Sequence, residues 1–297
     1  MIKRTLYFGN PASLSLKNEQ LVIIQDGIEK PKIPIEDIGY VILDHYQVSI
    51  SHGALSTLLD NKASVITTDK NHLPTGMFLP LDSHTEQGER FRLQVEVSHV
   101  LKKQLWQQTV MAKLRNQADL LDYVGLPDSY IRNMVGKVRT DDCTNRESAA
   151  SKYYWNTLFD SINFKRNRYG KPPNNLLNYG YAILRAVIAR ALLSSGLLPS
   201  LGIHHRNRYN AFPLADDIME PYRPFVDEIV WRLLHEEYDT TTLTPSIKKE
   251  LLQIPTVAVK INKENKPLMI AATWSSSSLQ KCYAGLINKI IYPEICK

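Results

Sequence analysis

The chain has few cysteines and no long apolar run, and both absences limit what it can be. Among its 297 residues are only three cysteines, Cys143, Cys282 and Cys296, whose spacing fits neither a zinc motif nor a disulfide framework. We therefore expect a reduced, cytoplasmic setting. No apolar run approaches the roughly 18–20 residues that span a bilayer. The first residues also lack the apolar segment of a secretory signal. The sequence thus predicts neither a membrane protein nor a disulfide-rich secreted one.

The charge is uneven along the chain, which bears on the kind of partner. The first 90 residues hold 8 Lys/Arg and 11 Asp/Glu, a net of −3, whereas the remaining residues hold 28 and 19, a net of +9. This asymmetry indicates a polyanionic partner that binds mainly to the C-terminal part. Charge alone also fits a solvated surface, and it does not separate DNA, RNA and an anionic membrane.

The first eighty residues predict a β-rich domain. Residues 13–23 alternate apolar and polar positions on both sides of a polar turn, which is typical of a β-hairpin. The other elements expected in this part are strands at 40–43, 48–51 and 64–68 and a short helix at 53–60. We place this domain at 1–82.

A polar stretch without periodicity follows, and we interpret 83–90 as a linker to a helical domain at 91–297. The spacing of apolar residues predicts one long helix that carries Val97, Val100, Leu101, Leu105 and Leu114. Further helices are expected around 181–192 and 225–234, and a small hairpin at 256–261 and 267–270. The serine-rich stretch at 275–278 is interpreted as leading into a final helix around 279–291. The predicted class is α+β.

Three ionisable residues in this second domain are candidates for a metal site. Glu147 lies at the predicted start of one helix, His205 follows a helix end, and Glu220 precedes Pro221 at another predicted helix start. Two carboxylates and one imidazole suit a divalent ion such as Mg²⁺ or Mn²⁺, with positions left for substrate oxygens.

Each candidate also has an ordinary structural interpretation. Thr144 and Glu147 have the spacing of a capping box. His204 and His205 both fit an exposed basic loop, and the residues alone do not choose between them. Asp217 and Glu220 fit the acidic first turn that a helix dipole favours. If Pro221 lies in that first turn, Glu220 is expected at an exposed helix end.

Basic residues surround these candidates and predict a phosphodiester substrate. The segment 165–171 combines four basic residues with Tyr169, which could stack on a base. A mobile solvated loop would show the same pattern. The residues expected to bind the nucleic acid, which the resemblance given below implies is DNA, are Arg146, Lys165, Arg166, Arg168, Lys171, Arg206, Arg208 and Arg223.

Together these stretches resemble the CRISPR-associated spacer-acquisition integrases, the "Cas-one" family, in the version found in type II loci. The similarity covers most of the chain. It rests on five segments in order: 70–80, 145–155, 174–181, 196–205 and 214–227. The resemblance implies a β-domain that forms a homodimer and an all-helical domain that holds the metal.

The resemblance also assigns residue roles. It implies that Glu147, His205 rather than His204, and Glu220 are the catalytic metal ligands, with Asp217 as a nearby second acid. Some family members carry aspartate where this chain has Glu220, which bears on metal preference.

The implied reaction is attack by the 3′-hydroxyl of a short DNA duplex on a phosphodiester at the leader–repeat junction of a CRISPR array. The implied partners are a small "Cas-two" protein, which bridges two dimers into a heterohexamer, and other type II acquisition proteins; no membrane is involved. Two alternatives stay open: a metal-dependent nuclease acting on branched DNA, and a DNA-binding scaffold without chemistry.

Overall fold

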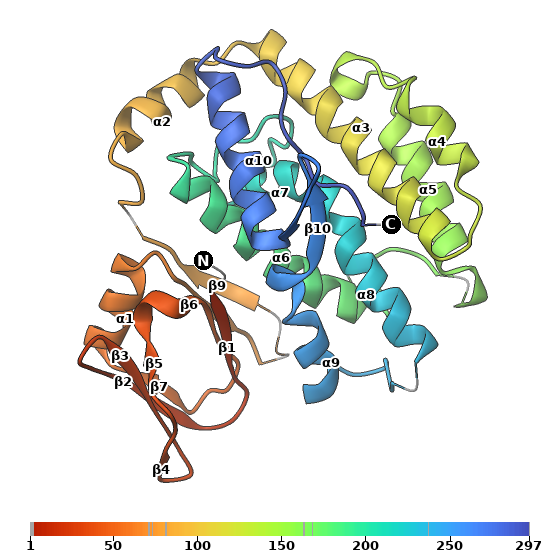
Figure 1. The fold of residues 1–297 in the computed structure, drawn as a ribbon. Coiled ribbons are helices and arrows are strands. Elements are labelled where there is room, and N and C mark those ends of the chain that lie inside the picture. Colours follow the sequence, from red (N-terminus) through yellow and green to blue (C-terminus); the bar gives the residue numbers. More distant parts are fainter. Residues whose placement is uncertain are drawn as a thin grey trace. The chain divides into compact units, whose positions relative to one another are not determined.

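The computed structural model describes residues 3–70, 72, 74–80, 82–162, 164–167, 169–236 and 238–296. It divides into two compact units, Met1–Ser83 and His84–Lys297. The first is built mainly of strands and the second mainly of helices, red to orange and yellow to blue in Figure 1. The predicted α+β class is therefore confirmed.

The β-rich unit contains two sheets. In one, β1 (Arg4–Phe8), β6 (Ile38–Leu43) and β8 (Ser64–Thr68) run parallel, and β9 (Pro74–Phe78) pairs antiparallel with β8. The other has the order β4-β3-β2-β7, and a fifth strand, β5, pairs with β3. Its strands are β2 (Ala12–Lys17), β3 (Gln20–Gln25), β4 (Ile28–Glu29), β5 (Ile33–Pro34) and β7 (Val48–Ile50).

The hairpin expected at 13–23 is β2–β3. Its turn residues Asn18 and Glu19 have φ of 50° and 56°, as a two-residue turn that follows the strand twist requires. Helix α1 (His52–Asp60) packs Leu58 into a core with Leu14 and Val41, each no more than 1% exposed. The expected strands and helix of this unit are confirmed. Strands β1, β4, β5 and β9 were not predicted. Strands β4 and β5 have only two residues each, and β9 contains Pro74 and Gly76, which weaken a strand signal.

The helical unit is built around two long helices, α3 (His99–Tyr123) and α6 (Asn174–Ser194). Helix α6 packs against α7, α8 and α10, and α3 packs against α4, α5 and α8 (Figure 1). The other helices are α2 (Gln87–Glu96), α4 (Ser129–Val135), α5 (Arg146–Leu158), α7 (Pro213–Met219), α8 (Arg223–His235), α9 (Pro245–Leu251) and α10 (Leu268–Tyr283).

Helix α6 is the one helix among the described residues that is long and apolar enough to cross a membrane. However, 72% of its apolar window is buried within the unit. It is therefore the core helix around which the others pack.

The division after Ser83 falls at the predicted linker, 83–90, but the second half of that stretch is helical. Helix α2 begins at Gln87 because Arg90 anchors it: its Nη1 donates to the Ser195 carbonyl at 2.9 Å and its Nη2 pairs with Glu86. The long helix expected to carry Val97, Val100, Leu101, Leu105 and Leu114 is α3, but it begins only at His99, so Val97 lies outside it.

Two further predictions for the C-terminal part need correction. The hairpin pairs β10 (Ala258–Ile261) with β11 (Glu264–Pro267), so its second strand is shifted, and the unit is mostly rather than entirely helical. The last helix, α10, begins at Leu268, and residues 284–296 are not helical. The serines at 275–278 therefore lie inside a helix. The buried hydroxyl of Ser275 donates a hydrogen bond to the Ile291 carbonyl, so it is not left without a partner.

Candidate metal-binding active site

Glu147 lies in the first turn of α5, and another acid caps that helix. Both oxygens of Asp142 accept backbone N–H groups, from Arg146 and from Glu147, each at 2.9 Å. The N-cap residue is Asn145, with φ of 52° and no side-chain capping bond. The capping box considered for Thr144 is therefore not formed, and the Glu147 carboxylate is not used by its own helix end.

His205 lies in a loop that the buried carboxylate of Asp217 organises. Asp217 accepts the backbone N–H groups of Ile203, His204 and His205 at 2.6, 3.0 and 3.1 Å. It also accepts Nδ1 of His205 at 2.6 Å. This bond orients the imidazole and makes Nε2 the nitrogen that can bind a metal, the usual arrangement of a carboxylate behind a histidine ligand.

A glycine allows this loop to close so tightly. A Cβ atom at Gly202 would lie 2.6 Å from the His205 carbonyl oxygen and 2.9 Å from Asp217 Oδ2. The glycine three residues before His205 is therefore required sterically, because any side chain at that position would collide with the loop.

The neighbouring histidine has a different environment. The His204 ring stacks on Trp106 of α3, with ring centres 4.2 Å apart and an angle of 4° between the planes. Its Nδ1 lies 3.7 Å from Asp141. Of the two histidines, His205 is therefore the better candidate for a metal ligand, because its ring contacts Asp217 and is close enough to Glu220 to affect its pKa.

Glu220 is placed where two helices meet. It begins the 3₁₀ turn η4 (Glu220–Tyr222) between α7 and α8, and it is only 5% exposed. The expectation of an exposed helix end is wrong, because α7 continues directly into η4 and Pro221 lies inside this junction. Burial disfavours the charged carboxylate, but Arg223 and Lys113 outweigh it and lower the pKa of Glu220 to about 2.

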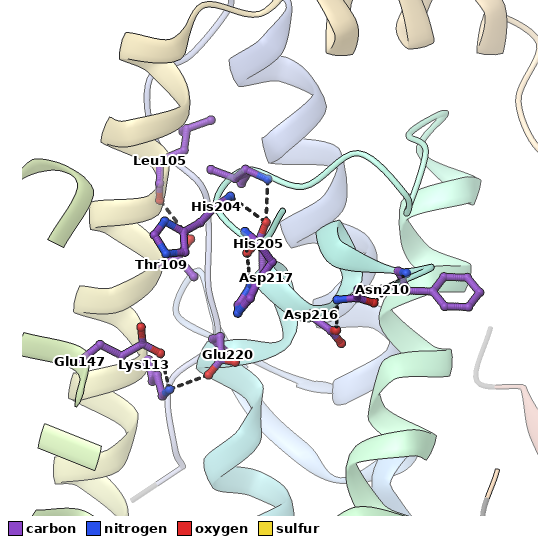
Figure 2. A network of polar contacts seen from close by, with 12 residues as sticks. Leu105, Thr109, Lys113, Glu147, His204, His205, Asn210, Asp216, Asp217 and Glu220 are labelled. Carbon is purple, nitrogen blue, oxygen red and sulfur yellow. Dashed lines mark hydrogen bonds and ion pairs between the residues drawn. The ribbon is translucent and has the colours of Figure 1, made fainter. Parts of the chain in front are cut away.

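Lys113 of α3 joins the two glutamates. Its Nζ lies 2.6 Å from Glu147 Oε1 and 2.6 Å from Glu220 Oε2 (Figure 2). Arg223 Nε donates to the other oxygen of Glu220 at 2.8 Å. Burial alone would lower the pKa of Lys113, but Glu220 and Glu147 raise it above its ordinary value, so the ammonium is retained.

Among the described residues, no three His, Cys, Asp or Glu side chains meet closely enough to hold a metal as they stand. The donor set nevertheless fits a divalent cation. Glu147 and Glu220 already converge on one cation, and the buried Glu220 Oε2 makes no hydrogen bond beyond its ion pair with Lys113. His205 is close enough to help lower the pKa of Glu220. Two carboxylates and one imidazole are therefore available if Lys113 yields its position.

A second polar network, centred on Asp227, adjoins the site through Arg223. Asp227 is 1% exposed and accepts the hydroxyls of Tyr154, at 2.8 Å, and Tyr181. The guanidinium of Arg223 lies over the Tyr181 ring, 4.6 Å from its centre. Burial raises the pKa of Asp227 to about 6, although the two tyrosine hydroxyls act in the opposite direction.

The basic residues expected to bind DNA fall into two groups. Lys165, Lys171, Arg206 and Arg208 are exposed. Arg166 and Arg223 have internal partners: Arg166 donates to Asn174 and Asn178, each at 2.8 Å, and Arg223 pairs with Glu220. Arg146 is partly buried, and Arg168 lies outside the described residues.

Two residues that shape the candidate site escaped the sequence analysis. Lys113 lies in a helical stripe with buried apolar neighbours such as Val110 and Leu114, and a lysine in such a stripe is a usable signal. Asp142 gave none, because it acts across a chain reversal in which Asp141, Asp142 and Asn145 have positive φ.

Structural comparison shows which fold this is. The chain superimposes on a casposase bound to integration product with a TM-score of 0.78 and 19% identity, covering 98% of this chain and 92% of that one. A Cas1 protein from Thermotoga maritima gives a TM-score of 0.73 and 17% identity, with 95% and 97% covered. The protein therefore has a Cas1-like fold.

Sequence comparison gives the family. The family model for CRISPR associated protein Cas1 matches residues 6–252. The CRISPR-associated endonuclease Cas1 of Neisseria meningitidis serogroup C (strain 8013) is 38% identical over 291 residues, which cover 97% of this chain and 94% of the relative. A second relative, Cas1 2 of Pyrobaculum aerophilum, is 27% identical over 275 residues, or 88% and 92% of the two chains. The chain belongs to the Cas1 family.

Proposed function

We propose that this protein is a metal-dependent DNA integrase that inserts new spacers into a CRISPR array in the cytoplasm. The 3′-hydroxyl of a short DNA duplex would attack a phosphodiester at the leader–repeat junction. Membership of the Cas1 family supports this role, as does the fold shared with a casposase bound to integration product. The observation that carries the proposal is the convergence of Glu147 and Glu220 on one cation, with His205 close to Glu220.

Glu147, His205 and Glu220 would hold Mg²⁺ or Mn²⁺, which when bound polarises the target phosphate and favours the alkoxide form of the attacking hydroxyl. Asp217 orients His205 through Nδ1 and so keeps Nε2 directed away from itself. Arg223 fixes Oε1 of Glu220, so the ion would take Oε2, which Lys113 contacts in this structure. No side chain needs to act as the nucleophile, because the DNA end supplies it.

The exposed Lys165, Lys171, Arg206 and Arg208 would contact DNA phosphates, and binding should then weaken with salt. The proposed assembly is a homodimer formed through the β-rich unit, with two dimers bridged by Cas2. Solved complexes whose names contain both Cas1 and Cas2 include a chain with this fold, at a TM-score of 0.76. The type II subclass and its other acquisition proteins stay predictions.

A strand-transfer assay tests this function. The protein and its Cas2 partner are mixed with a labelled short duplex and a supercoiled plasmid that carries a leader and repeat, in Mn²⁺ or Mg²⁺. Label joined to the plasmid by the wild-type protein, but not by Glu147→Ala or in chelator, is the expected result. Cut plasmid without joined label would instead indicate a nuclease. Binding with neither product, alongside an active control complex, would indicate a scaffold.

A further inference from the structure

Lys113 is a buried charge that the proposed reaction does not use. It is 8% exposed, and its Nζ lies 2.6 Å from one oxygen of each glutamate that would hold the metal. Figure 2 shows it between Glu147 and Glu220. A metal held by these two glutamates would therefore compete with the ammonium for the same two carboxylates.

The charges around these oxygens are already balanced. Glu147 and Glu220 carry two negative charges, and Lys113 and Arg223 carry two positive ones. The carboxylate of Asp217 is matched separately by three backbone N–H groups and His205. A divalent ion added to this arrangement would leave two positive charges without partners in a mostly buried place, which is strongly unfavourable.

A small cavity beside Lys113 could hold an anion that balances the charge of the displaced ammonium. The cavity has a volume of about 130 Å³, and its lining contains three cationic side chains, Lys113, Arg166 and Arg223, and two carboxylates, Glu220 and Asp227. If a metal takes Glu220, the three cations are left with one carboxylate in this lining. An anionic group such as a DNA phosphate that enters there would restore the charge balance.

We propose that Lys113 competes with the divalent metal for Glu147 and Glu220, so that the metal binds tightly only when a DNA phosphate balances the displaced ammonium. The proposal rests on the proposed function, since it takes these glutamates as metal ligands. Because binding free energies are reciprocal, the metal must then strengthen DNA binding by the same factor by which DNA strengthens metal binding. The site would remain closed to metal until substrate arrives.

Mn²⁺ binding to the full-length protein tests this directly, with free Mn²⁺ measured by electron paramagnetic resonance, in the presence and absence of a short DNA duplex. In the wild type, DNA should tighten Mn²⁺ binding. Lys113→Met should bind Mn²⁺ about tenfold or more tightly without DNA, because the competing charge is gone, and should lose most of the enhancement by DNA. Lys113→Arg keeps the charge, and Lys103→Met removes an exposed lysine from the same helix. Both should behave like the wild type.

A folded Lys113→Met protein with unchanged or weaker Mn²⁺ affinity would overturn the proposal, as would a wild type whose Mn²⁺ affinity ignores DNA. If Lys113→Met does not fold without metal, its thermal melting is measured in the absence and presence of Mn²⁺. Recovery of a cooperative melt in Mn²⁺ would support replacement of the lysine by the metal, and no recovery at saturating Mn²⁺ would reject it.

His205→Asn separates the two hypotheses. If it abolishes Mn²⁺ binding while Lys113→Met leaves the affinity unchanged, the metal site stands and only the competition fails. If His205→Asn leaves Mn²⁺ binding intact, the assigned site itself is wrong, and the competition falls with it.

Discussion

The Nδ1 atom of His205 lies 2.6 Å from Oδ1 of Asp217, and the same carboxylate accepts three consecutive backbone N–H groups of the histidine loop. One buried side chain therefore fixes both the position of the loop and the orientation of the imidazole. In the proposed metal site, Asp217 would therefore act as a positioning residue for His205, whereas the sequence analysis predicted a second acid.

Asp217→Asn is expected to weaken Mn²⁺ binding and strand transfer by about 10–100-fold, because loss of the charge removes the orientation of the ligand histidine. Mn²⁺ titration and the rate of joined product measure the two effects. Asp216→Asn is the matched control, since Asp216 pairs with Arg185 and Asn210 instead. Equal loss of Mn²⁺ affinity in both variants would contradict the assigned role.

Gly202→Ala should disrupt the same loop without changing any polar group. Its Cβ would lie 2.6 Å from a backbone oxygen, and overpacking of this kind costs about 1–3 kcal/mol of unfolding free energy. All four tryptophans lie in the helical unit, so denaturant unfolding followed by tryptophan fluorescence reports on it. At Gly136 an added Cβ has no atom within 4 Å, so Gly136→Ala should be tolerated. A Gly202→Ala protein as stable and active as Gly136→Ala would refute this interpretation.

Asp227 should make stability depend on pH in a direction opposite to that of most carboxylates. Its pKa of about 6 in the folded protein exceeds its ordinary value of 3.8, so between these pH values the folded state holds a proton that the unfolded chain has released. The contribution of this group to stability therefore falls as pH rises through that window, by about 3 kcal/mol. Asp227→Asn should remove this component.

Chemical denaturation of wild type and Asp227→Asn from pH 4 to 7 measures it. The difference in unfolding free energy between the two should change in favour of the variant as pH rises. Parallel curves would show that burial of Asp227 carries no such penalty.

The exposed basic residues predict a specific salt dependence of DNA binding. Lys165→Ala and Lys171→Ala should each weaken binding to all duplex sequences alike and reduce the slope of log K against log salt by about one. Fluorescence anisotropy at several salt concentrations measures the slope. Lys249→Ala changes an exposed lysine on α9 that is not among the residues predicted to bind DNA, and it should leave the slope unchanged. An unaltered slope in both loop variants would place the DNA elsewhere.

The features that the sequence predicts well are those set by local periodicity. The β2–β3 hairpin and helix α8 follow from alternation and from helical spacing. The start of α10 was misplaced because a serine run was interpreted as a helix boundary, whereas Ser275 bonds to a carbonyl sixteen residues away. Such a tertiary partner is invisible in a local window.

The candidate site likewise combines features that the local sequence predicts with features that depend on tertiary contacts. Glu147, His205 and Glu220 were chosen from residue type and family resemblance, yet their environments could not be predicted from spacing. The burial of Glu220 depends on a junction between α7 and α8, and its cation comes from Lys113, more than a hundred positions earlier in the chain. Contacts over that separation follow from the packing of α3 against η4, which no local pattern records.

The most direct test of the whole account is single-turnover strand transfer in Mn²⁺ by the complex with Cas2, compared across matched variants. Glu147→Gln, His205→Asn and Glu220→Gln should each lower the rate of joining by about a hundredfold or more, since several kcal/mol of transition-state stabilisation are lost with a metal ligand. Ser148→Ala and His204→Asn, which change immediate neighbours of two of these residues, should retain most of the rate. Undiminished joining by any of the first three variants would contradict the proposed metal site, and loss of joining in His204→Asn rather than His205→Asn would show that the wrong histidine had been assigned.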